Sequence, residues 1–195
     1  MIRNLFLIQI LLLSSCAFLQ YDDILLITKQ QVFGVDQIEP SEELISAYQE
    51  SFLIINIGKI KSFVMVLNKI NKDGYYWQSN DGVRIVTNRF GKILKTSGLD
   101  FNFEIIEDGF DADTKSYEGM IMLLNPRAII QQDVGLVVES KKQGKSIHER
   151  VFNNNLKSTW NNFYYIDANG FPVSTKQKTH PNLPEIEMSF YFKFN

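Results

Sequence analysis

The sequence predicts an all-β fold in which antiparallel meanders form a sandwich or a partly open barrel, with one short helix near residues 41–48. The chain contains fifteen Phe, eight Tyr and two Trp, and aromatic side chains favour strands over helices. Turn signals with Asn, Asp and Gly recur at short, regular spacing between residues 58 and 98, which is typical of an antiparallel sheet. A length of 195 residues suits one domain with a substantial core.

The N-terminus has the pattern of a bacterial lipoprotein signal. Arg3 precedes nine mainly apolar residues at positions 5–13. A membrane-spanning helix needs about 20 apolar residues, so this shorter run is typical of a secretory signal. Leu13-Ser14-Ser15-Cys16 then matches the lipobox, in which a Leu and two small residues precede the lipid-bearing cysteine. The alternatives are an ordinary signal peptide with an incidental cysteine, and a buried N-terminal helix with Cys16 in the core.

Processing at the lipobox predicts three segments. Residues 1–15 are removed as the signal peptide, residues 16–38 form the lipid-anchored N-terminus and a tether, and residues 39–195 form a single β-rich domain. By analogy with bacterial lipoproteins, Cys16 carries diacylglycerol and an N-linked acyl chain such as palmitate, and two chains suffice for stable anchoring. Ala17 follows the cysteine where an Asp would signal retention, which by the same analogy favours the outer membrane, with the domain facing the periplasm.

Residues 24–67 contain the predicted helix and four candidate strand ranges, two of them in the tether. Residues 24–28 and 31–35 are either strands or part of a tether with a short helical piece. Pro40 and the early carboxylates Glu42 and Glu43 suit the N-terminus of the helix near residues 41–48. Residues 51–58 and 62–67 are dense in Ile, Val, Phe and Leu. Their length favours strands, although such continuous apolar runs do not exclude a buried helix.

A three-stranded meander is predicted over residues 75–99. Tyr75-Tyr76-Trp77 leads into two short runs, residues 83–87 and 92–96, that are rich in β-branched and apolar residues. Turns at residues 80–82 and 88–91 bound these runs. Each of the turns ends in a glycine, which tolerates the positive φ that tight hairpins require.

The second half of the chain predicts further antiparallel strands. They are expected at residues 101–106, 117–124, 128–140, 147–152 and 185–194, with a hairpin over residues 161–174. Asn125-Pro126 forms the break between two of these strands. The basic turn at residues 141–145 is expected to be a hydrated hairpin tip that discourages pairing at a sheet edge.

An acidic loop follows at residues 107–115. Asp108, Asp111, Asp113 and Glu118 have the hard oxygen ligands that calcium prefers. However, the glycine and the final glutamate do not fall where an EF-hand requires them, so we expect a solvated loop and no metal site.

The sequence shows no catalytic set. His148 and His180 lie in unrelated contexts, and no nucleophile elbow, phosphate-binding loop or dinucleotide fingerprint occurs. Cys16, the one cysteine, is assigned to lipid, which leaves no thiol and excludes an internal disulfide. A glycosidase would need two carboxylates, and the available ones are Asp81, Asp100, Glu104 and Asp167. Asp81 and Asp167 lie in turns that favour Asp for backbone reasons, so neither enzymatic activity nor a cofactor beyond the lipid is predicted.

Two stretches resemble a known family. Residues 75–99 contain an aromatic residue followed by W-x-S-x-D-G, then V-T-N and G-K-I-L-K-T-x-G-L. Residues 161–174 resemble the hairpin of the same family, and Gln177, Pro181 and Pro184 fall where that family has Q-x-x-x-P-x-(L/I)-P. These motifs resemble the GfcB/YjbF family of bacterial lipoproteins, which is associated with capsule and exopolysaccharide production. The resemblance covers residues 40–192 and implies a pathway rather than a reaction.

Aromatic residues are the main candidates for binding. Sugar rings stack on aromatic planes, and amide side chains bond to hydroxyls, so the candidate glycan-binding or partner-binding residues are Tyr76, Trp77, Trp160, Tyr164 and Asn162. The simpler interpretation is that these aromatics fill the core. A formal charge of −2 without a basic tract argues against a nucleic-acid partner.

The sequence and the resemblance together predict a lipid-anchored envelope protein that assists the secretion or assembly of capsule or exopolysaccharide. Its expected action is binding to a glycan or to polysaccharide-export proteins, without covalent chemistry. The alternatives are a polysaccharide-modifying enzyme and a structural envelope lipoprotein without a glycan role.

Overall fold

The structure is a computed structural model that describes residues 38, 40–59, 61–72, 74–111 and 113–193. Residues Gln37–Asn195 form one compact unit. The predictions for the signal peptide, the lipobox with Cys16, the tether and the strands at residues 24–28 and 31–35 fall outside the described residues. Within the described ranges, no helix is both long enough and apolar enough to cross a membrane.

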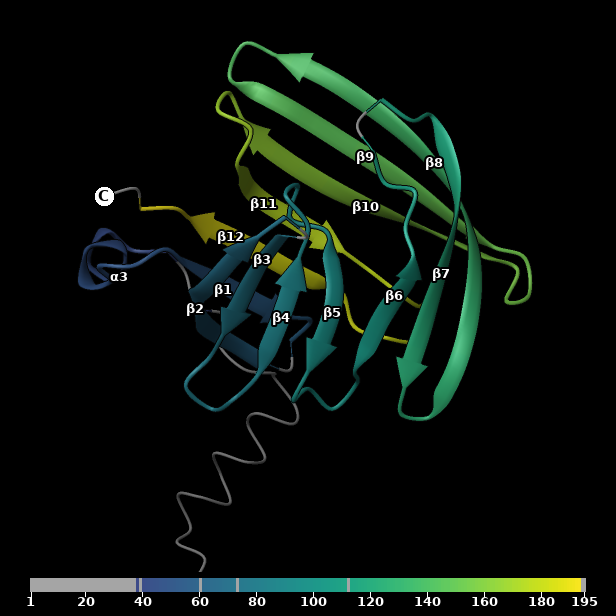
Figure 1. Cartoon of the computed structure of the whole chain (residues 1–195), viewed down its shortest axis with the longest axis horizontal. Helices are drawn as coiled ribbons and strands as arrows, with labels where there is room; N and C mark the ends of the chain where they lie inside the picture. Colours follow the sequence, from purple (N-terminus) through teal and green to yellow (C-terminus); the bar gives the residue numbers. More distant parts are fainter. Residues whose placement is uncertain (1–37, 39, 60, 73, 112, 194–195) are drawn as a thin grey trace, which may run out of the picture. The chain divides into compact units, whose positions relative to one another are not determined.

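The described residues form twelve antiparallel strands that close into a barrel (Figure 1). The strands are β1 (Phe52–Ile57), β2 (Lys61–Asn71), β3 (Gly74–Gln78), β4 (Arg84–Thr87), β5 (Ile93–Ser97), β6 (Phe103–Glu107), β7 (Ser116–Leu124), β8 (Arg127–Lys141), β9 (Gly144–Asn153), β10 (Ser158–Asp167), β11 (Pro172–Gln177) and β12 (Ile186–Tyr191). Each strand pairs with the next along the chain, and β1 also pairs with β12. The fold is therefore nearly all-β, as predicted.

Closure of the sheet corrects one prediction, because the fold is neither a sandwich nor a partly open barrel. β1 pairs with β2 on one side and with β12 on the other, where Phe52 lies opposite Tyr191. The weakest junction is between β5 and β6, where Lys95 and Glu104 form the one registered pair. Side chains reinforce this junction, since the backbone N–H of Phe103 donates to Thr96 Oγ1 at 3.0 Å. A sequence reveals neighbouring hairpins but not a pairing between its first and last strands, so closure was not predictable.

Helix α3 (Glu42–Ala47) confirms the one predicted helix. The hydroxyl of Ser41 accepts a hydrogen bond from the backbone N–H of Leu44 at 3.1 Å, which caps the helix N-terminus. The C-terminal end is held from the far end of the chain, because Lys193 Nζ donates to the carbonyl oxygens of Ile45 and Tyr48 at 2.8 and 2.6 Å.

β1 is buried on both faces, with Phe52, Leu53, Ile54 and Ile55 all buried. The aromatic ring of Phe52 stacks between those of Tyr48 and Tyr191, at centroid distances of 4.6 and 4.8 Å. Burial on both faces explains why the sequence of this strand is apolar without alternation.

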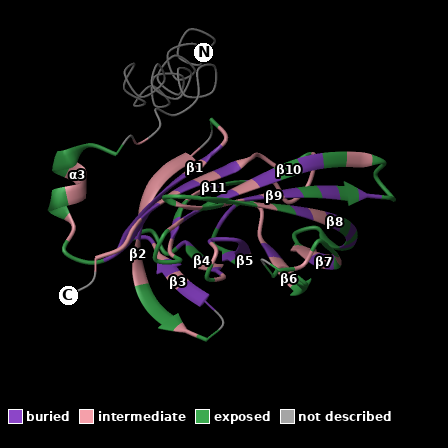
Figure 2. Ribbon diagram, turned by 90° about the horizontal axis from the view of Figure 1, so that it is seen from above, coloured by how far each residue is buried: buried purple, intermediate pink, exposed green. Residues whose placement is uncertain are grey.

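Most other strands alternate between buried and exposed residues (Figure 2). The inward residues form two clusters. The larger one gathers around Trp77, Phe103 and the inward side chains of β1 and β12. The smaller one lies on β8, β9 and β10 and includes Val134, Trp160 and Tyr164.

The structure confirms the predicted turns at residues 88–91 and within residues 161–174. Gly91 has φ +84° and Gly170 has φ +91°, a region that side chains other than glycine rarely adopt. The break predicted at Asn125-Pro126 joins β7 to β8 through a cis peptide bond. β2 extends to Asn71, beyond the predicted residues 62–67, and β12 is shorter than predicted because it ends at Tyr191.

Candidate functional site

The alternation of β10 separates the predicted binding residues from the surface. Trp160, Asn162 and Tyr164 point into the core, with exposed fractions of 7%, 6% and 0%. On the outer face of the same strand lie Asn161 and Tyr165, both exposed, and the half-buried Phe163. On β3, Tyr75 and Trp77 are buried and Tyr76 is half-buried on the opposite face, as the alternation predicts.

A buried cluster of polar side chains surrounds Glu149 on β9, which is 1% exposed. Its Oε1 atom is 2.9 Å from Lys92 Nζ and also accepts a hydrogen bond from the Tyr117 hydroxyl. Its Oε2 atom accepts hydrogen bonds from Asn162 Nδ2 at 2.6 Å and from the Tyr164 hydroxyl at 2.7 Å. Two of the predicted binding residues therefore serve this interior group, which we name the Glu149 cluster. It consists of Lys92, Asp108, Tyr117, Glu149, Asn162 and Tyr164.

Lys92 connects the Glu149 cluster to the acidic loop. Its Nζ atom lies 2.8 Å from Asp108 Oδ1 and bonds to the Tyr117 hydroxyl. The same atom lies 4.9 Å from the ring centroids of Phe110 and Tyr117, a cation–π geometry. The described residues of the loop at 107–115 are mostly exposed, as predicted, while the Asp108 carboxylate pairs with Lys92, because a buried cation needs an anionic partner.

The environment fixes the ionisation of the Glu149 cluster. Burial by itself would raise the pKa of Glu149, but the charge of Lys92 and hydrogen bonds from Tyr117, Asn162 and Tyr164 outweigh it and lower the pKa. Burial and the charge of Glu149 raise the pKa of Tyr117 and of Tyr164. Both hydroxyls therefore stay protonated and donate hydrogen bonds to Glu149. The cluster thus links the strands through charged and hydrogen-bonded side chains.

Trp160 has a different environment, because its indole Nε1 atom is buried without a hydrogen-bond partner among the described residues. Trp77, by contrast, donates from its indole Nε1 atom to Thr87 Oγ1 at 3.1 Å. Both rings are packed in the core, as the simpler interpretation of the aromatic residues expected.

Tyr76 is the predicted binding residue that reaches a surface cavity. This cavity, which we name the Tyr76 groove, lies against strands β2 to β6 and has a volume of about 870 Å³. Its lining comprises Asn68, Tyr76, Trp77, Gln78, Arg84, Ile85, Val86, Leu94, Lys95, Ser97, Glu104 and Ile105. Cross-strand register places Tyr76 opposite Val86, and Gln78 opposite Arg84, so these side chains share the outer face.

The Tyr76 groove offers an aromatic ring beside free polar groups. The Tyr76 hydroxyl accepts a hydrogen bond from Asn71 Nδ2 at 3.1 Å, and Lys69 Nζ lies 5.9 Å from its ring centroid. Lys95 and Glu104 pair at 2.9 Å. The side chains of Gln78 and Arg84 form no hydrogen bond or ion pair with another described residue. With Arg84 and Lys95 against Glu104, the lining carries a formal charge of +1.

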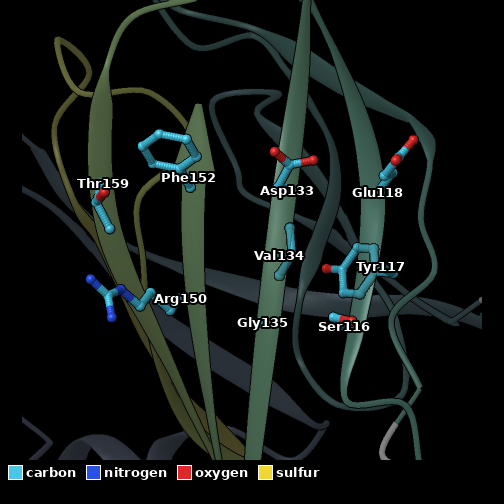
Figure 3. Close-up of a pocket in the computed structure, with 9 residues that line it drawn as sticks. All are labelled: Ser116, Tyr117, Glu118, Asp133, Val134, Gly135, Arg150, Phe152 and Thr159. Carbon is cyan, nitrogen blue, oxygen red and sulfur yellow. The ribbon is translucent and has the colours of Figure 1, made fainter. Parts of the chain in front are cut away.

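A second cavity lies on the outer face of β7 to β10 (Figure 3). We name it the Gly135 groove; its volume is about 750 Å³ and its lining is Ser116, Tyr117, Glu118, Asp133, Val134, Gly135, Arg150, Phe152 and Thr159. Sequence inspection did not single it out. Gly135, which lies among the alternating residues of β8, was the one sequence feature that could have indicated this cavity. The sequence did not indicate which residues of neighbouring strands would surround it.

The remaining candidate residues have local partners. Asp167 Oδ1 accepts from the backbone N–H groups of Asn169 and Phe171 at 2.9 and 2.8 Å, which confirms its role in the turn. Among the other carboxylates, Asp81 bonds to the Ser79 hydroxyl and Asp100 pairs with Lys61 at 3.0 Å.

The two histidines lie apart from any cluster of candidate catalytic groups. His148 stacks on Phe163 at a centroid distance of 4.7 Å and bonds to Asn161, whereas His180 accepts from the backbone N–H of Asn182. No group of three or more His, Cys, Asp and Glu residues within the described ranges is arranged to hold a metal ion.

Comparisons with known proteins agree with the resemblance seen in the sequence. A family model described as "Group 4 capsule polysaccharide lipoprotein gfcB, YjbF" matches residues 28–121. This match confirms the resemblance to the GfcB/YjbF family for the motifs at residues 75–99, whereas the motifs at residues 161–184 lie outside the matched range. The crystal structure of the hypothetical lipoprotein YmcC from Escherichia coli K12 is similar in fold, with a TM-score of 0.65 and 19% sequence identity over 78% of this chain and 89% of that chain. No curated protein matches the chain.

Proposed function

We propose, with the confirmed resemblance to the GfcB/YjbF capsule lipoproteins as the premise, that this chain is a lipid-anchored envelope protein that binds polysaccharide non-covalently during capsule or exopolysaccharide assembly. The observation that supports this most directly is the Tyr76 groove. All of its lining residues lie between Asn68 and Ile105, inside the residues that the family model matches.

The chemistry of the Tyr76 groove suits a sugar chain. The Tyr76 ring supplies a face on which the C–H groups of a sugar ring can stack. Gln78 and Arg84 supply hydrogen-bond donors that no described residue uses. Behind the cavity, the Trp77 ring points into the core and holds the strand in place through its bond to Thr87. Few, well-placed polar groups around an aromatic surface are typical of small-molecule sites.

In this proposal, the buried residues Trp160, Asn162 and Tyr164 stabilise the barrel and do not contact the sugar. Tyr164 and Asn162 donate hydrogen bonds to Glu149, and Trp160 of β10 packs in the core cluster with residues of β8 and β9. Their contribution to binding is therefore indirect, through the rigidity of the outer face.

Binding without chemistry is proposed because a glycosidase needs two carboxylates, whereas the described lining of the Tyr76 groove contains one, Glu104, which pairs with Lys95. The membrane partner is the bilayer that holds the lipid on Cys16, which we place in the outer membrane with the barrel in the periplasm.

The experiment measures binding of the full-length lipidated protein, in detergent, to the purified surface polysaccharide of its source organism. Tyr76→Ala is expected to weaken binding about two- to twelvefold, because it removes a stacking contact of roughly 0.5–1.5 kcal/mol. Tyr165→Ala is the matched control, since Tyr165 is an exposed tyrosine on β10, outside the Tyr76 groove.

Three results would contradict this function. One is unchanged affinity in Tyr76→Ala, and another is a polysaccharide that becomes shorter during incubation, which would indicate an enzyme. The third is capture of an export protein without any polysaccharide binding, which would make the chain an adaptor.

A further inference from the structure

We infer that the Gly135 groove is a second saccharide site, and that it takes uncharged sugar units. This inference rests on the proposed function and extends it to another part of the barrel. The first observation is that neither backbone conformation nor packing requires a glycine at position 135. The backbone of Gly135 is outside the left-handed region, and a Cβ atom built there would meet no heavy atom within 4 Å.

Glycine is a poor choice for this position on structural grounds alone. Gly135 lies inside β8, where a residue without a side chain weakens the strand. Its neighbours Val134 and Leu136 are buried in the core, so Gly135 itself faces outward. Glycine within a strand often marks a place where a ligand approaches the backbone closely. The missing side chain leaves the floor of the groove flat.

The walls of the Gly135 groove carry complementary hydrogen-bonding groups. Arg150 lies directly opposite Gly135 on β9. Asp133, on β8, lies opposite Glu118 on β7 in one direction and opposite Phe152 on β9 in the other. Figure 3 shows Arg150 and Phe152 on the strand at one side of Gly135, Glu118 on the strand at the other side, and Asp133 farther along the strand of Gly135 itself.

These groups have spare bonding capacity. The side chains of Arg150 and Glu118 form no hydrogen bond or ion pair with another described residue. Asp133 accepts one bond, from Asn154 Nδ2 at 2.7 Å, and a carboxylate accepts several. Phe152 is 41% exposed and offers an apolar face at the rim.

The charge of the lining selects the kind of sugar. Carboxylates only accept hydrogen bonds and a guanidinium only donates them, whereas a sugar hydroxyl does both. With Glu118 and Asp133 against Arg150, the formal charge of the lining is −1, which disfavours an acidic sugar. The Tyr76 groove has the opposite formal charge of +1. The two grooves therefore prefer different units, neutral in the Gly135 groove and acidic in the Tyr76 groove.

The test fills the Gly135 groove without disturbing the fold. Full-length lipidated protein and its Gly135→Val variant are titrated with neutral hexasaccharides of glucose, mannose and galactose, and with a hexamer of galacturonate. We expect Gly135→Val to lose at least tenfold in affinity for the neutral hexasaccharide that binds best, with affinity for galacturonate unchanged. Its thermal midpoint should equal or exceed that of the wild type, because Val suits a strand and meets open space. Gly135→Ala should lose less affinity.

Ser146→Val is the matched control, because Ser146 lies on β9 outside the Gly135 groove. Neutral sugars that bind neither protein, or that bind Gly135→Val as well as wild type, would overturn the inference. So would a thermal midpoint that falls in Gly135→Val, which would show that the fold needs the glycine. Loss of a dimer in place of sugar affinity would make the groove an interface between copies. Loss of galacturonate binding in Tyr76→Ala, with neutral binding intact, tests the Tyr76 groove separately.

Discussion

Two turn glycines with similar backbone angles have different surroundings. A Cβ atom at Gly91 would lie 2.8 Å from Thr175 Cγ2 and 3.0 Å from Pro172 Cβ, whereas a Cβ atom at Gly170 would meet nothing within 4 Å. Both have positive φ, so both resist a β-branched side chain.

We therefore expect Gly170→Val to lose about 1–3 kcal/mol of unfolding free energy through backbone strain alone. Gly91→Val should lose more, because the new side chain also overpacks the core. Thermal unfolding monitored by circular dichroism measures both variants. Equal midpoints for the two variants would contradict the role assigned to the close contacts of Gly91.

Which face of β10 is buried was not predictable from the sequence. The pattern of β10 indicates that alternate residues face opposite sides, and the structure confirms this. However, Trp160, Asn162 and Tyr164 are as suited to sugar binding as Asn161, Phe163 and Tyr165, and composition does not reveal which set faces inward. The inward set is fixed by Glu149, a buried residue on β9 that belongs to none of the recognised motifs. Its carboxylate needs Asn162 and Tyr164 as hydrogen-bond donors, so these two side chains face inward.

At the scale of elements, the Glu149 cluster joins β7, β9 and β10 to the acidic loop and to Lys92, the residue immediately before β5. Breaking a buried ion pair costs roughly 3–5 kcal/mol when one charge is left alone. In Glu149→Gln, Lys92 keeps Asp108 as a partner, so we expect a loss of about 3 kcal/mol, near the lower end of that range. Urea denaturation at pH 7 measures this loss.

Glu104→Gln is the matched control, because the Lys95–Glu104 pair is largely exposed and exposed pairs contribute less than about 1 kcal/mol. A loss in Glu149→Gln as small as in this control would show that the cluster does not tie the strands together.

The pH dependence of stability follows from the lowered pKa of Glu149. A carboxylate with a lower pKa in the folded state stabilises the protein at pH values above its unfolded pKa, near 4.5, and this contribution is lost as pH falls through the folded value. We expect the stability difference between wild type and Glu149→Gln to be constant near neutral pH and to shrink below about pH 4.5. Urea titrations from pH 7 to pH 3 test this. A difference that stays constant down to pH 3 would contradict it.

Most elements were predictable from local patterns, and the misses have physical causes. The meander at residues 75–99 emerged as β3, β4 and β5 because its turn chemistry is explicit. The described residues of the acidic loop are mostly exposed, as its composition predicts. The ion pair between Asp108 and Lys92, sixteen positions earlier, was not predictable, because no local pattern shows a pairing between residues so far apart in the sequence.

For the whole molecule, the predicted lipid anchor gives a direct test. Cys16→Ser should accumulate as a precursor that retains residues 1–15 and takes up no labelled palmitate, because the thioether to diacylglycerol cannot form. Metabolic labelling followed by mass spectrometry of the N-terminus measures both. Gly170→Val, which leaves the lipobox intact, serves as a control and should still be labelled. Palmitate that persists in Cys16→Ser would contradict the assignment of the lipobox.

The pairing of β1 with β12 sets the order in which this protein can be completed. Phe52 meets Tyr191 across the closing junction, so one side of β1 has no strand partner until the last part of the chain is present. Contacts so distant in sequence form slowly, because a long loop must close first. The barrel can therefore close only after the C-terminal strand is present. Truncation that removes Ile186–Tyr191 would leave β1 and β11 as unpaired sheet edges, which are prone to pair with other chains.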